Sequence, residues 1–356
     1  MTLSKRDRHL PKENEIWLLI DSLTFGGIET HVLELSYGLS QFGHSVRVVF
    51  VTQYDHASPL VDRLQMANIQ YSYLYQISGS PKRLNPLRAL SRAVRIHRPK
   101  LLHAHGYKAS ILSKLVKLAP SGRTINQFTT FHAGESPTGK VRLYDAIDRY
   151  SAFISQANFA VSQLVQDKVQ STSIVLNNFI STDKLHLSEG EQIAFVGRLS
   201  REKGPDRFVN LAGQFPYLEF HIYGSGPMET ELLDRGEPNI VYHGHQNNMS
   251  KVWESVGILV ISSRFEGLPM AALEAMARGI PVVAMNVGAL STLITHGTNG
   301  WIANSPEELS ACLMEWLQMS PSQQHEVAIN ACNTVTHSYS SQAVIPQILH
   351  HYHLES

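Results

Sequence analysis

Two glutamates eight positions apart carry the strongest chemical signal in the sequence. Glu266 and Glu274 lie in a string, residues 264–277, that follows an apolar run and opens a helix-like stretch. Glu266 is expected on the loop and Glu274 about one turn into the helix. Carboxylate oxygens accept hydrogen bonds from the vicinal hydroxyls of a sugar, and the free amides of Gly267 and Leu268 can donate to oxygens at the helix start. The plainer alternative is an N-capping acid followed by a solvated glutamate.

Two cations follow an earlier strand-like run. Arg198 and Lys203 lie in the string Gly-Arg-Leu-Ser-Arg-Glu-Lys-Gly at 197–204. In an otherwise acidic half of the chain, two cations on one loop can neutralise a diphosphate leaving group. An ordinary surface loop is the alternative. The string Gly-Ser-Gly-Pro at 224–227 lets the backbone approach a ligand closely, although a plain turn explains it equally well.

A glycine-containing loop and two histidine pairs complete the candidate groups. Residues 25–31, Phe-Gly-Gly-Ile-Glu-Thr-His, precede the first helix-like stretch, where backbone amides can face a phosphate. The string is neither the dinucleotide fingerprint nor a P-loop, and a tight turn competes with the phosphate interpretation. His103 and His105, like His243 and His245, would share one face of a strand. No third ligand is apparent for either pair, so no metal ion is expected.

These groups stand at the ends of apolar runs that alternate with amphipathic stretches along the chain. The strand-like runs lie at 16–20, 46–50, 101–102 and 128–131, and then at 193–197, 220–223, 240–242, 258–261 and 281–284. Such alternation predicts parallel sheets covered by helices, with ligands at the carboxyl ends of the strands. We therefore predict an α/β protein of two facing Rossmann-like, doubly wound domains that share one cleft.

The pattern restarts after a break rich in Ser, Thr, Asp and Gly, and this break sets the predicted boundaries. They are a polar tail at 1–15, an N-terminal domain at 16–183, a linker at 184–190, a C-terminal domain at 191–335 and a helical segment at 336–356 able to pack back on the N-terminal domain. A length of 356 residues suits two domains of about 150 residues each.

Composition narrows the compartment and the class of protein. The only cysteines, Cys312 and Cys332, are far apart and lack ligand-type spacing, which argues against a disulfide framework or a zinc site. Residues 1–15 lack the apolar core of a signal peptide. No apolar run approaches the roughly 18 residues of a membrane-spanning helix. The expected location is the cytoplasm, with peripheral docking on the inner face of the membrane as an option.

Charge divides the chain into a basic and an acidic half. Residues 1–187 hold 22 Lys and Arg against 13 Asp and Glu, whereas residues 188–356 hold 8 against 17. Basic side chains gather at Lys82, Arg83, Arg88, Arg92, Arg95, Arg98, Lys100, Lys108, Lys114 and Lys117. An apolar cluster in the same region consists of Ile111, Leu112, Leu115 and Val116. The pattern favours an anionic membrane or a phosphorylated acceptor as partner; a solvated basic face is the alternative, and nucleic acid is not expected.

Together these strings resemble glycosyltransferase family 4, a retaining, metal-independent family with the GT-B fold. The resemblance runs over nearly the whole chain and is carried most specifically by the pair of glutamates with its flanks. The strings that carry it are Gly26-Gly27, Val161-Ser162, Asn177, Gly197-Arg198, Lys203-Gly204, Gly224 to Pro227, Glu266 to Glu274, Gly279 to Val283 and Asn299-Gly300.

The resemblance implies a role for each matching residue. Glu274 would bind the ribose hydroxyls of the nucleotide, and Glu266, with the amides of Gly267 and Leu268, would hold the donor sugar. Arg198 and Lys203 would hold the diphosphate. Gly27 would touch the diphosphate from the opposite domain, and His132 would line the cleft near the reacting sugar.

The implied function is retaining transfer of a hexosyl or N-acetylhexosaminyl group from a nucleotide diphosphate-sugar to a saccharide or lipid-linked acceptor, in cell-surface polysaccharide, lipopolysaccharide or glycolipid biosynthesis. The C-terminal domain would bind the donor and the N-terminal domain the acceptor, with no metal and no cofactor. The chain contains no Asp-x-Asp metal clamp, which suits leaving-group stabilisation by protein cations.

The sequence departs from the family pattern in two places, and two alternative functions stay open. Asn178 replaces the family glycine after Asn177, and Ala289 and Thr292 stand where a glycine and a glutamate are common. They obscure the identity of the donor and leave the two cations and two glutamates in place. The alternative functions are a nucleotide-sugar epimerase of the same architecture and a non-catalytic nucleotide-sugar-binding module.

Overall fold

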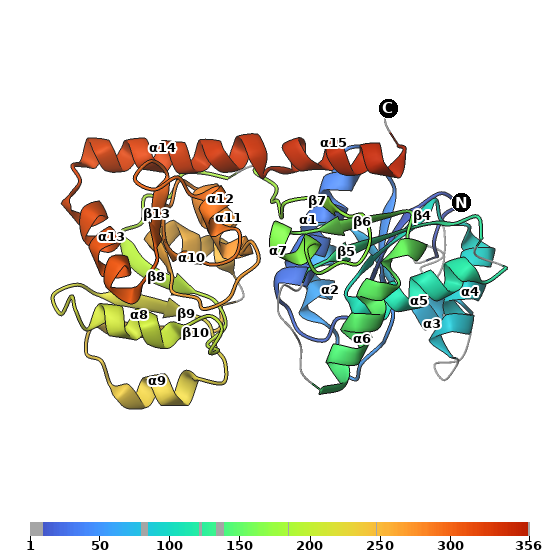
Figure 1. Ribbon diagram of the computed structural model, residues 1–356, viewed down its shortest axis with the longest axis horizontal. Helices are drawn as coiled ribbons and strands as arrows, with labels where there is room; N and C mark the ends of the chain where they lie inside the picture. The colour runs from blue at the N-terminus through green and yellow to red at the C-terminus, as the bar shows by residue number, and fades with distance from the viewer. Residues whose placement is uncertain are drawn as a thin grey trace, which may run out of the picture. The chain divides into compact units, whose positions relative to one another are not determined.

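The computed structural model divides the chain into two compact units (Figure 1). The structure describes residues 10–79, 85–120, 123–132, 139–183, 185–246 and 248–354. The first unit comprises Met1–Asn177 with Val344–Ser356, and the second comprises Asn178–Ala343. The division therefore falls before the predicted linker at 184–190, and the C-terminal segment joins the first unit at Val344, later than the predicted position 336.

The first unit is built on a seven-stranded parallel sheet with the order β3-β2-β1-β4-β5-β6-β7. Its strands are β1 Ile16–Ile20, β2 Val46–Phe50, β3 Gln70–Tyr73, β4 Leu101–His105, β5 Asn126–Phe131, β6 Ala157–Ala160 and β7 Ile174–Val175. Every residue of β1, β2 and β4 is buried, because the strands at the centre of a parallel sheet are covered on both faces. The strand order reverses between β1 and β4, which makes their carboxyl ends the switch point where ligands bind in such sheets.

Helices of the first unit cover this sheet (Figure 1). They are α1 Gly27–Gln41, α2 Pro59–Met66, α3 Leu74–Ile77, α4 Pro86–His97, α5 Tyr107–Leu118, α6 Gly139–Tyr150 and α7 Gln163–Gln166, with a 3-10 turn at Ala152–Ile154. Asn85 caps α4 by accepting a hydrogen bond from the Leu87 amide, and Pro86 occupies the first turn, where its missing N–H costs nothing. The last helix, α15 Ser341–Tyr352, ends in this unit, with the Tyr352 ring 4.8 Å from that of Phe128.

A buried ion pair ties the start of the described chain to the first sheet. Arg47 on β2 donates to both carboxylate oxygens of Glu15, at 2.8 and 3.1 Å, and both side chains are buried. Glu15, which the sequence analysis assigned to the polar tail, is therefore part of the first unit. A glutamate is usually exposed to solvent, so its residue type placed Glu15 in the tail. Its buried partner could not be foreseen, because Arg47 lies 32 positions away.

The second unit has a six-stranded parallel sheet with the order β10-β9-β8-β11-β12-β13. Its strands are β8 Gln192–Val196, β9 Phe220–Tyr223, β10 Ile240–Gly244, β11 Val256–Ile261, β12 Val282–Met285 and β13 Gly300–Ala303. The order reverses between β8 and β11, so the loops after these two strands flank the switch point of this sheet. Two parallel, doubly wound sheets confirm the predicted α/β class.

The helices of the second unit are set by local capping signals as well as by apolar faces. They are α8 Pro205–Ala212, α9 Glu229–Arg235, α10 Met249–Ser255, α11 Met270–Met276, α12 Leu290–Leu293, α13 Pro306–Gln318 and α14 Pro321–Ser338. Ser320 and Gln323 form a reciprocal capping box at the start of α14. Among the helices that the structure describes, none combines the length and apolarity needed to cross a membrane.

Candidate functional site

Glycines allow the loops at the switch point of the second sheet to approach one another closely. A side chain at Gly224 would collide with the Gly197 carbonyl, and one at Gly204 with the Ser262 carbonyl. Gly204 also has φ +64°, a backbone conformation that favours glycine. Gly288 lies in the same way against the carbonyls of Glu266 and its neighbour Gly267. These glycines, of which Gly204 and Gly224 belong to the predicted strings, therefore bring the loops after β8, β9, β11 and β12 into contact.

Lys203 and Glu266, predicted separately from two strings, meet across this switch point. Lys203 Nζ donates to both carboxylate oxygens of Glu266, at 2.8 and 2.7 Å. The Glu266 side chain is 7% exposed and that of Lys203 33% exposed. Ser263 Oγ, which the sequence analysis missed, donates to Glu266 Oε1 at 2.7 Å. Two donors thus hold the carboxylate in place, while the lysine remains open to a ligand.

The remaining donor-site candidates of the second unit lie around α11. Trp253, a second residue that the sequence analysis missed, donates its indole N–H to Glu274 Oε2 at 2.9 Å. Leu268 is buried, and its carbonyl accepts a hydrogen bond from Asn178 at 2.8 Å. Within the described parts of the chain, the amides of Gly267 and Leu268 donate to no protein acceptor. These two amides are available to an oxygen of a ligand, as the sequence predicts.

The two arginines beside the site have different surroundings. Arg198 is exposed on the loop after β8. It helps to lower the pKa of Glu202, although the main cause is the hydrogen bond from Ser200 to that carboxylate. Arg264 instead forms a two-pronged pair with Asp206, at 2.8 and 2.6 Å, and so ties the loop after β11 to α8. Arg198 is the cation that faces solvent, whereas Arg264 is structural.

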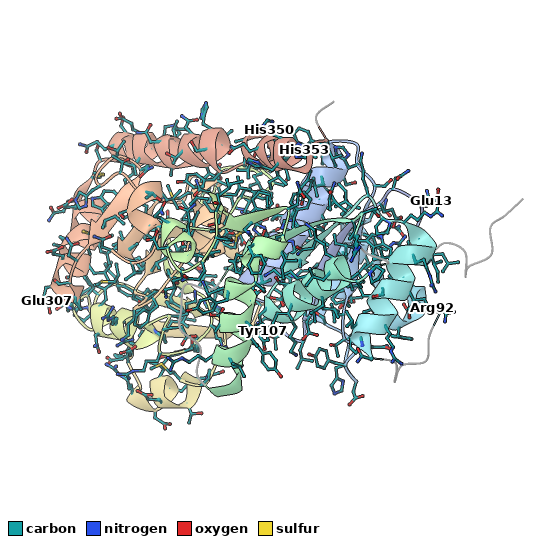
Figure 2. The ribbon with its side chains drawn as sticks, turned by 45° about the vertical axis from the view of Figure 1, so that its right-hand side comes forward. Glu13, Arg92, Tyr107, Glu307, His350 and His353 are labelled. Atoms are coloured by element: carbon teal, nitrogen blue, oxygen red, sulfur yellow. The ribbon has the colours of Figure 1, made fainter. Side chains whose placement is uncertain are left out.

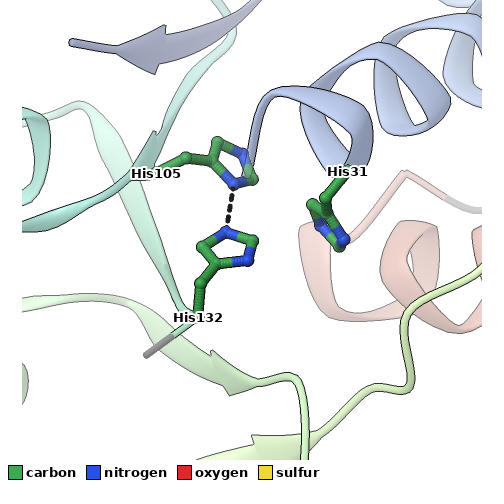
Figure 3. A group of neighbouring side chains, drawn as sticks. All are labelled: His31, His105 and His132. Carbon is green, nitrogen blue, oxygen red and sulfur yellow. Dashed lines mark hydrogen bonds between the residues drawn. The ribbon is translucent and has the colours of Figure 1, made fainter. Parts of the chain in front are cut away.

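Two predicted residues belong to the first unit. Gly27 is the first residue of α1 and is exposed, with open space where a side chain would stand. His132 follows β5 and is half-buried. Its Nε2 lies 3.1 Å from Nδ1 of His105 at the end of β4, and the His31 ring on α1 packs against it with centroids 4.8 Å apart (Figure 3).

Burial favours the neutral form of His103, His105 and His132, because it lowers the pKa of each imidazole. Desolvation, reinforced by neighbouring imidazoles, holds the pKa values of His105 and His132 well below the ordinary histidine value. Desolvation has the same effect on the pKa of His103, whose ring nitrogens are 2.5 Å from the Tyr352 hydroxyl and 2.7 Å from the Thr130 hydroxyl. A neutral imidazole can both donate and accept a hydrogen bond.

The histidines of the two predicted pairs have other neighbours than the sequence suggested. His103 points to hydroxyl partners and takes no part in the group, whereas His105 gains two neighbours, His31 and His132, which together with it make a group of three imidazoles. The sequence analysis missed it because His31 and His132 lie on α1 and after β5, and only the topology brings them to β4. In the second unit, His243 lies 3.0 Å from His221 on the neighbouring strand β9.

Comparison with known proteins finds two family models, each of which matches one half of the chain. The model described as Glycosyltransferase Family 4 matches residues 25–183, and that described as Glycosyl transferases group 1 matches residues 190–319. An uncharacterized glycosyltransferase of Haemophilus influenzae is 31% identical over 166 residues, which are 42% of this chain and 47% of that protein. A GDP-mannose-dependent alpha-mannosyltransferase of Corynebacterium glutamicum is 28% identical over 45% of this chain and 39% of its own length.

Further matches come from one more curated relative and from solved structures. The O-antigen biosynthesis glycosyltransferase WbnH of Escherichia coli is 32% identical over 33% of this chain and 34% of its own length. The aligned parts thus span less than half of each of these three relatives. Among solved structures, Anabaena HepE in complex with UDP and glucose has a TM-score of 0.78 at 17% identity, covering 95% of this chain and 99% of that one. Staphylococcus aureus TarM has a TM-score of 0.79 at 11% identity, with 95% and 98% covered. These likenesses establish the GT-B fold.

Proposed function

The chain belongs to glycosyltransferase family 4, and we propose that it transfers a hexosyl or N-acetylhexosaminyl group from a nucleotide diphosphate-sugar to a saccharide or lipid-linked acceptor. Transfer proceeds with retention of anomeric configuration and without a metal ion. The names of similar proteins, one in O-antigen biosynthesis and one bound to UDP and glucose, support a role in making cell-surface polysaccharide or glycolipid.

The contact between Lys203 and Glu266 carries this proposal. The two residues come from loops 63 positions apart and meet at the switch point of the second sheet, where ligands of such sheets bind. A cation beside a fixed carboxylate suits a ligand with a phosphate at one end and hydroxyls at the other, because each group finds a complementary partner. A nucleotide sugar has this arrangement at its diphosphate and its hexose.

The proposed roles cover the leaving diphosphate, the donor sugar and the ribose. Negative charge grows on the diphosphate as the glycosidic bond breaks, and Arg198 and Lys203 stabilise that charge more in the transition state than in the ground state. Glu266 and the open amides of Gly267 and Leu268 hold the hydroxyls of the sugar. Glu274 accepts hydrogen bonds from the ribose hydroxyls.

In this proposal the first unit binds the acceptor, and it also contributes Gly27 toward the donor diphosphate and His132 toward the reacting sugar. Gly27 offers an exposed backbone amide at the start of α1, a helix end that favours anionic oxygens. His132 offers a neutral, half-buried imidazole to a sugar hydroxyl.

A thermal-shift panel of nucleotide sugars tests the proposal and names the donor. A ligand present at 100 times its dissociation constant should stabilise the protein by about 2.7 kcal/mol. Mass measurement of the products, with and without acceptor, then separates transfer from epimerisation. A heavier acceptor and free nucleotide are expected; an isomerised nucleotide sugar formed without acceptor would instead identify an epimerase. Binding without any turnover would identify a non-catalytic module.

We further propose that the first unit docks on an anionic membrane through helix α6. The α6 surface consists of Val141, Leu143, Tyr144, Ile147, Tyr150 and the following Phe153, all of them exposed. Leu143 is 63% and Phe153 76% exposed, whereas Asp148 and Arg149 of the same helix are buried. The usual amphipathic pattern is therefore inverted, and a contiguous apolar face of this kind indicates an apolar partner.

The membrane contact lies on α6 rather than on the apolar cluster of α5 that the sequence suggested. Leu112 and Val116 belong to the core of the first unit, and of that cluster Leu115 is the exposed member. Lys114, counted among the basic surface residues, is buried and donates to Asp148 on α6 at 2.7 Å.

Basic residues that match an anionic surface remain on the neighbouring helices. Arg88, Arg92 and Arg95 are exposed on α4, which packs against α5, and α5 in turn packs against α6; Figure 2 shows Arg92 at the outer side of its helix. Lys82 and Arg83 lie outside the described residues. Each basic residue near an anionic surface contributes about 1 kcal/mol, and this contribution weakens beyond a Debye length.

Vesicle co-sedimentation decides between docking and a solvated basic face. The protein should bind anionic vesicles at low salt, and high salt should release it. A double variant, Leu143→Ser with Phe153→Ser, should bind far less, whereas Leu233→Ser, which alters an exposed leucine of the second unit, should bind as the wild type does. Equal partitioning onto neutral and anionic vesicles, or none onto either, would contradict docking.

A further inference from the structure

Three imidazoles from separate elements of the first unit converge on one point. His31 comes from α1, His105 from the end of β4 and His132 from the residue after β5 (Figure 3). One ring nitrogen from each lies within 4.8 Å of the others. The carboxyl ends of β4 and β5 are neighbours in the sheet, so the backbone fixes two of the three positions.

One nitrogen of this cluster lacks the partner that a buried polar atom normally has. His105 is 1% exposed, and its Nε2 contacts no hydrogen-bond partner in the described parts of the protein. Buried polar atoms are nearly always satisfied, so this ring carries an unmet hydrogen-bonding capacity, and Nδ1 is the nitrogen that faces His132. His103, whose ring is tilted against that of His105 with centroids 4.3 Å apart, is itself held by Tyr352 and Thr130 and so restricts the His105 ring.

The one pair of nitrogens in the cluster whose separation is known has a spacing that suits a tetrahedral transition metal. Nδ1 of His105 and Nε2 of His132 are 3.1 Å apart, close to the separation of about 3.3 Å for two nitrogens on an ion with zinc–nitrogen bonds of about 2.0–2.1 Å. The ligand set contains nitrogen alone, which favours zinc, copper or nickel over magnesium or manganese, whose preferred ligands are oxygens.

We propose that His31, His105 and His132 bind one divalent transition-metal ion of the zinc type. This site lies beyond the proposed transferase function and does not depend on it. Because His132 would be engaged by the ion, occupancy removes that imidazole from the acceptor side. The ion would therefore inhibit transfer, and the proposed reaction itself needs no metal.

Metal titration of the full-length protein tests the site. Zn²⁺ is titrated by calorimetry into protein freed of metal by a chelator, and Co²⁺ is followed by its visible absorption. Both are measured in a variant with His350→Gln and His353→Gln, because these exposed histidines near the C-terminus (Figure 2) could bind metal by themselves. The expected result is one ion per chain and the visible bands of nitrogen-ligated Co²⁺.

Single substitutions then assign the ligands. His132→Gln and His31→Gln should each weaken Zn²⁺ binding at least about tenfold, since loss of even a residue that only supports a ligand costs that much. His243→Gln, which alters a two-histidine contact in the second unit, should leave the affinity unchanged. His132 is half-buried, so its glutamine variant is expected to fold, and thermal unfolding without metal checks this. No bound ion, or unchanged affinity in folded His132→Gln and His31→Gln, would overturn the proposal. The titration contains no nucleotide sugar, so its outcome is separate from that of the transferase test.

Discussion

Replacing Lys203 by alanine should slow turnover far more than it weakens donor binding. Lys203 Nζ makes two contacts to Glu266, at 2.7 and 2.8 Å, and remains 33% exposed toward solvent. In the proposed mechanism its charge opposes the charge that develops on the leaving diphosphate. Loss of one such preorganised donor costs about 2.7–4 kcal/mol, or about 10²–10³ in kcat.

The fold should survive this substitution, because Ser263 still donates to Glu266 at 2.7 Å. Steady-state kinetics with the donor found in the thermal-shift panel measure the effect, and thermal denaturation confirms folding. If Lys203 bound the donor equally well in the ground state and the transition state, its loss would raise KM and leave kcat unchanged. Loss of a contact made only in the transition state lowers kcat.

Arg201→Ala is the matched control. It removes one positive charge from an exposed side chain on the same loop, two positions from Lys203. Its kcat should stay close to that of the wild type. Near-normal kcat in Lys203→Ala, or an equally large loss in Arg201→Ala, would refute the assignment of leaving-group stabilisation to Lys203.

Three further predictions follow from particular contacts. Glu274→Ala should weaken nucleotide binding about ten- to a hundredfold, as expected for lost charged hydrogen bonds; unchanged affinity by calorimetry would contradict the ribose role. Lys114→Met should destabilise the first unit by about 3–5 kcal/mol in urea unfolding, because it leaves the buried Asp148 carboxylate without its cation, whereas Lys117→Met, on a half-buried lysine of the same helix, should have a much smaller effect. Gly224→Ala should destabilise by more than about 1 kcal/mol, since the new methyl group meets the Gly197 carbonyl; an unchanged melting temperature would argue against this close approach of the loops.

Local patterns predicted nine of the described strands and missed β3, β6, β7 and β13. The strands β1 and β2 have the predicted bounds, because a run of five mostly apolar residues is typical of a buried strand. The boundary between the units could not be predicted in the same way. Asn178 and Ser188 look like linker residues by composition, yet Asn178 bonds the Leu268 carbonyl and Ser188 the carbonyls of Trp253 and Val256, so both are anchored to the second unit.

Candidate residues could be found where a string carries its own chemistry, and they were missed where distant residues combine. Lys203 and Glu266 were assigned from separate strings, and the sheet order brings them together. Ser263, Trp253 and His31 are ordinary residues in the sequence, and their roles depend on partners contributed by other elements. The buried Lys114 misled the charge analysis because a net count cannot distinguish an internal ion pair from a surface charge.

The central claim is retaining transfer of a sugar from its nucleotide, and the anomeric configuration of the first-formed product tests it most directly. The protein is incubated with its identified nucleotide sugar, a lipid-linked or saccharide acceptor and a chelator, and the product is followed by NMR from the earliest turnover. We predict equal amounts of nucleoside diphosphate and glycosylated acceptor, with the anomeric configuration of the donor preserved. An inverted linkage, or turnover that requires an added metal ion, would contradict the account.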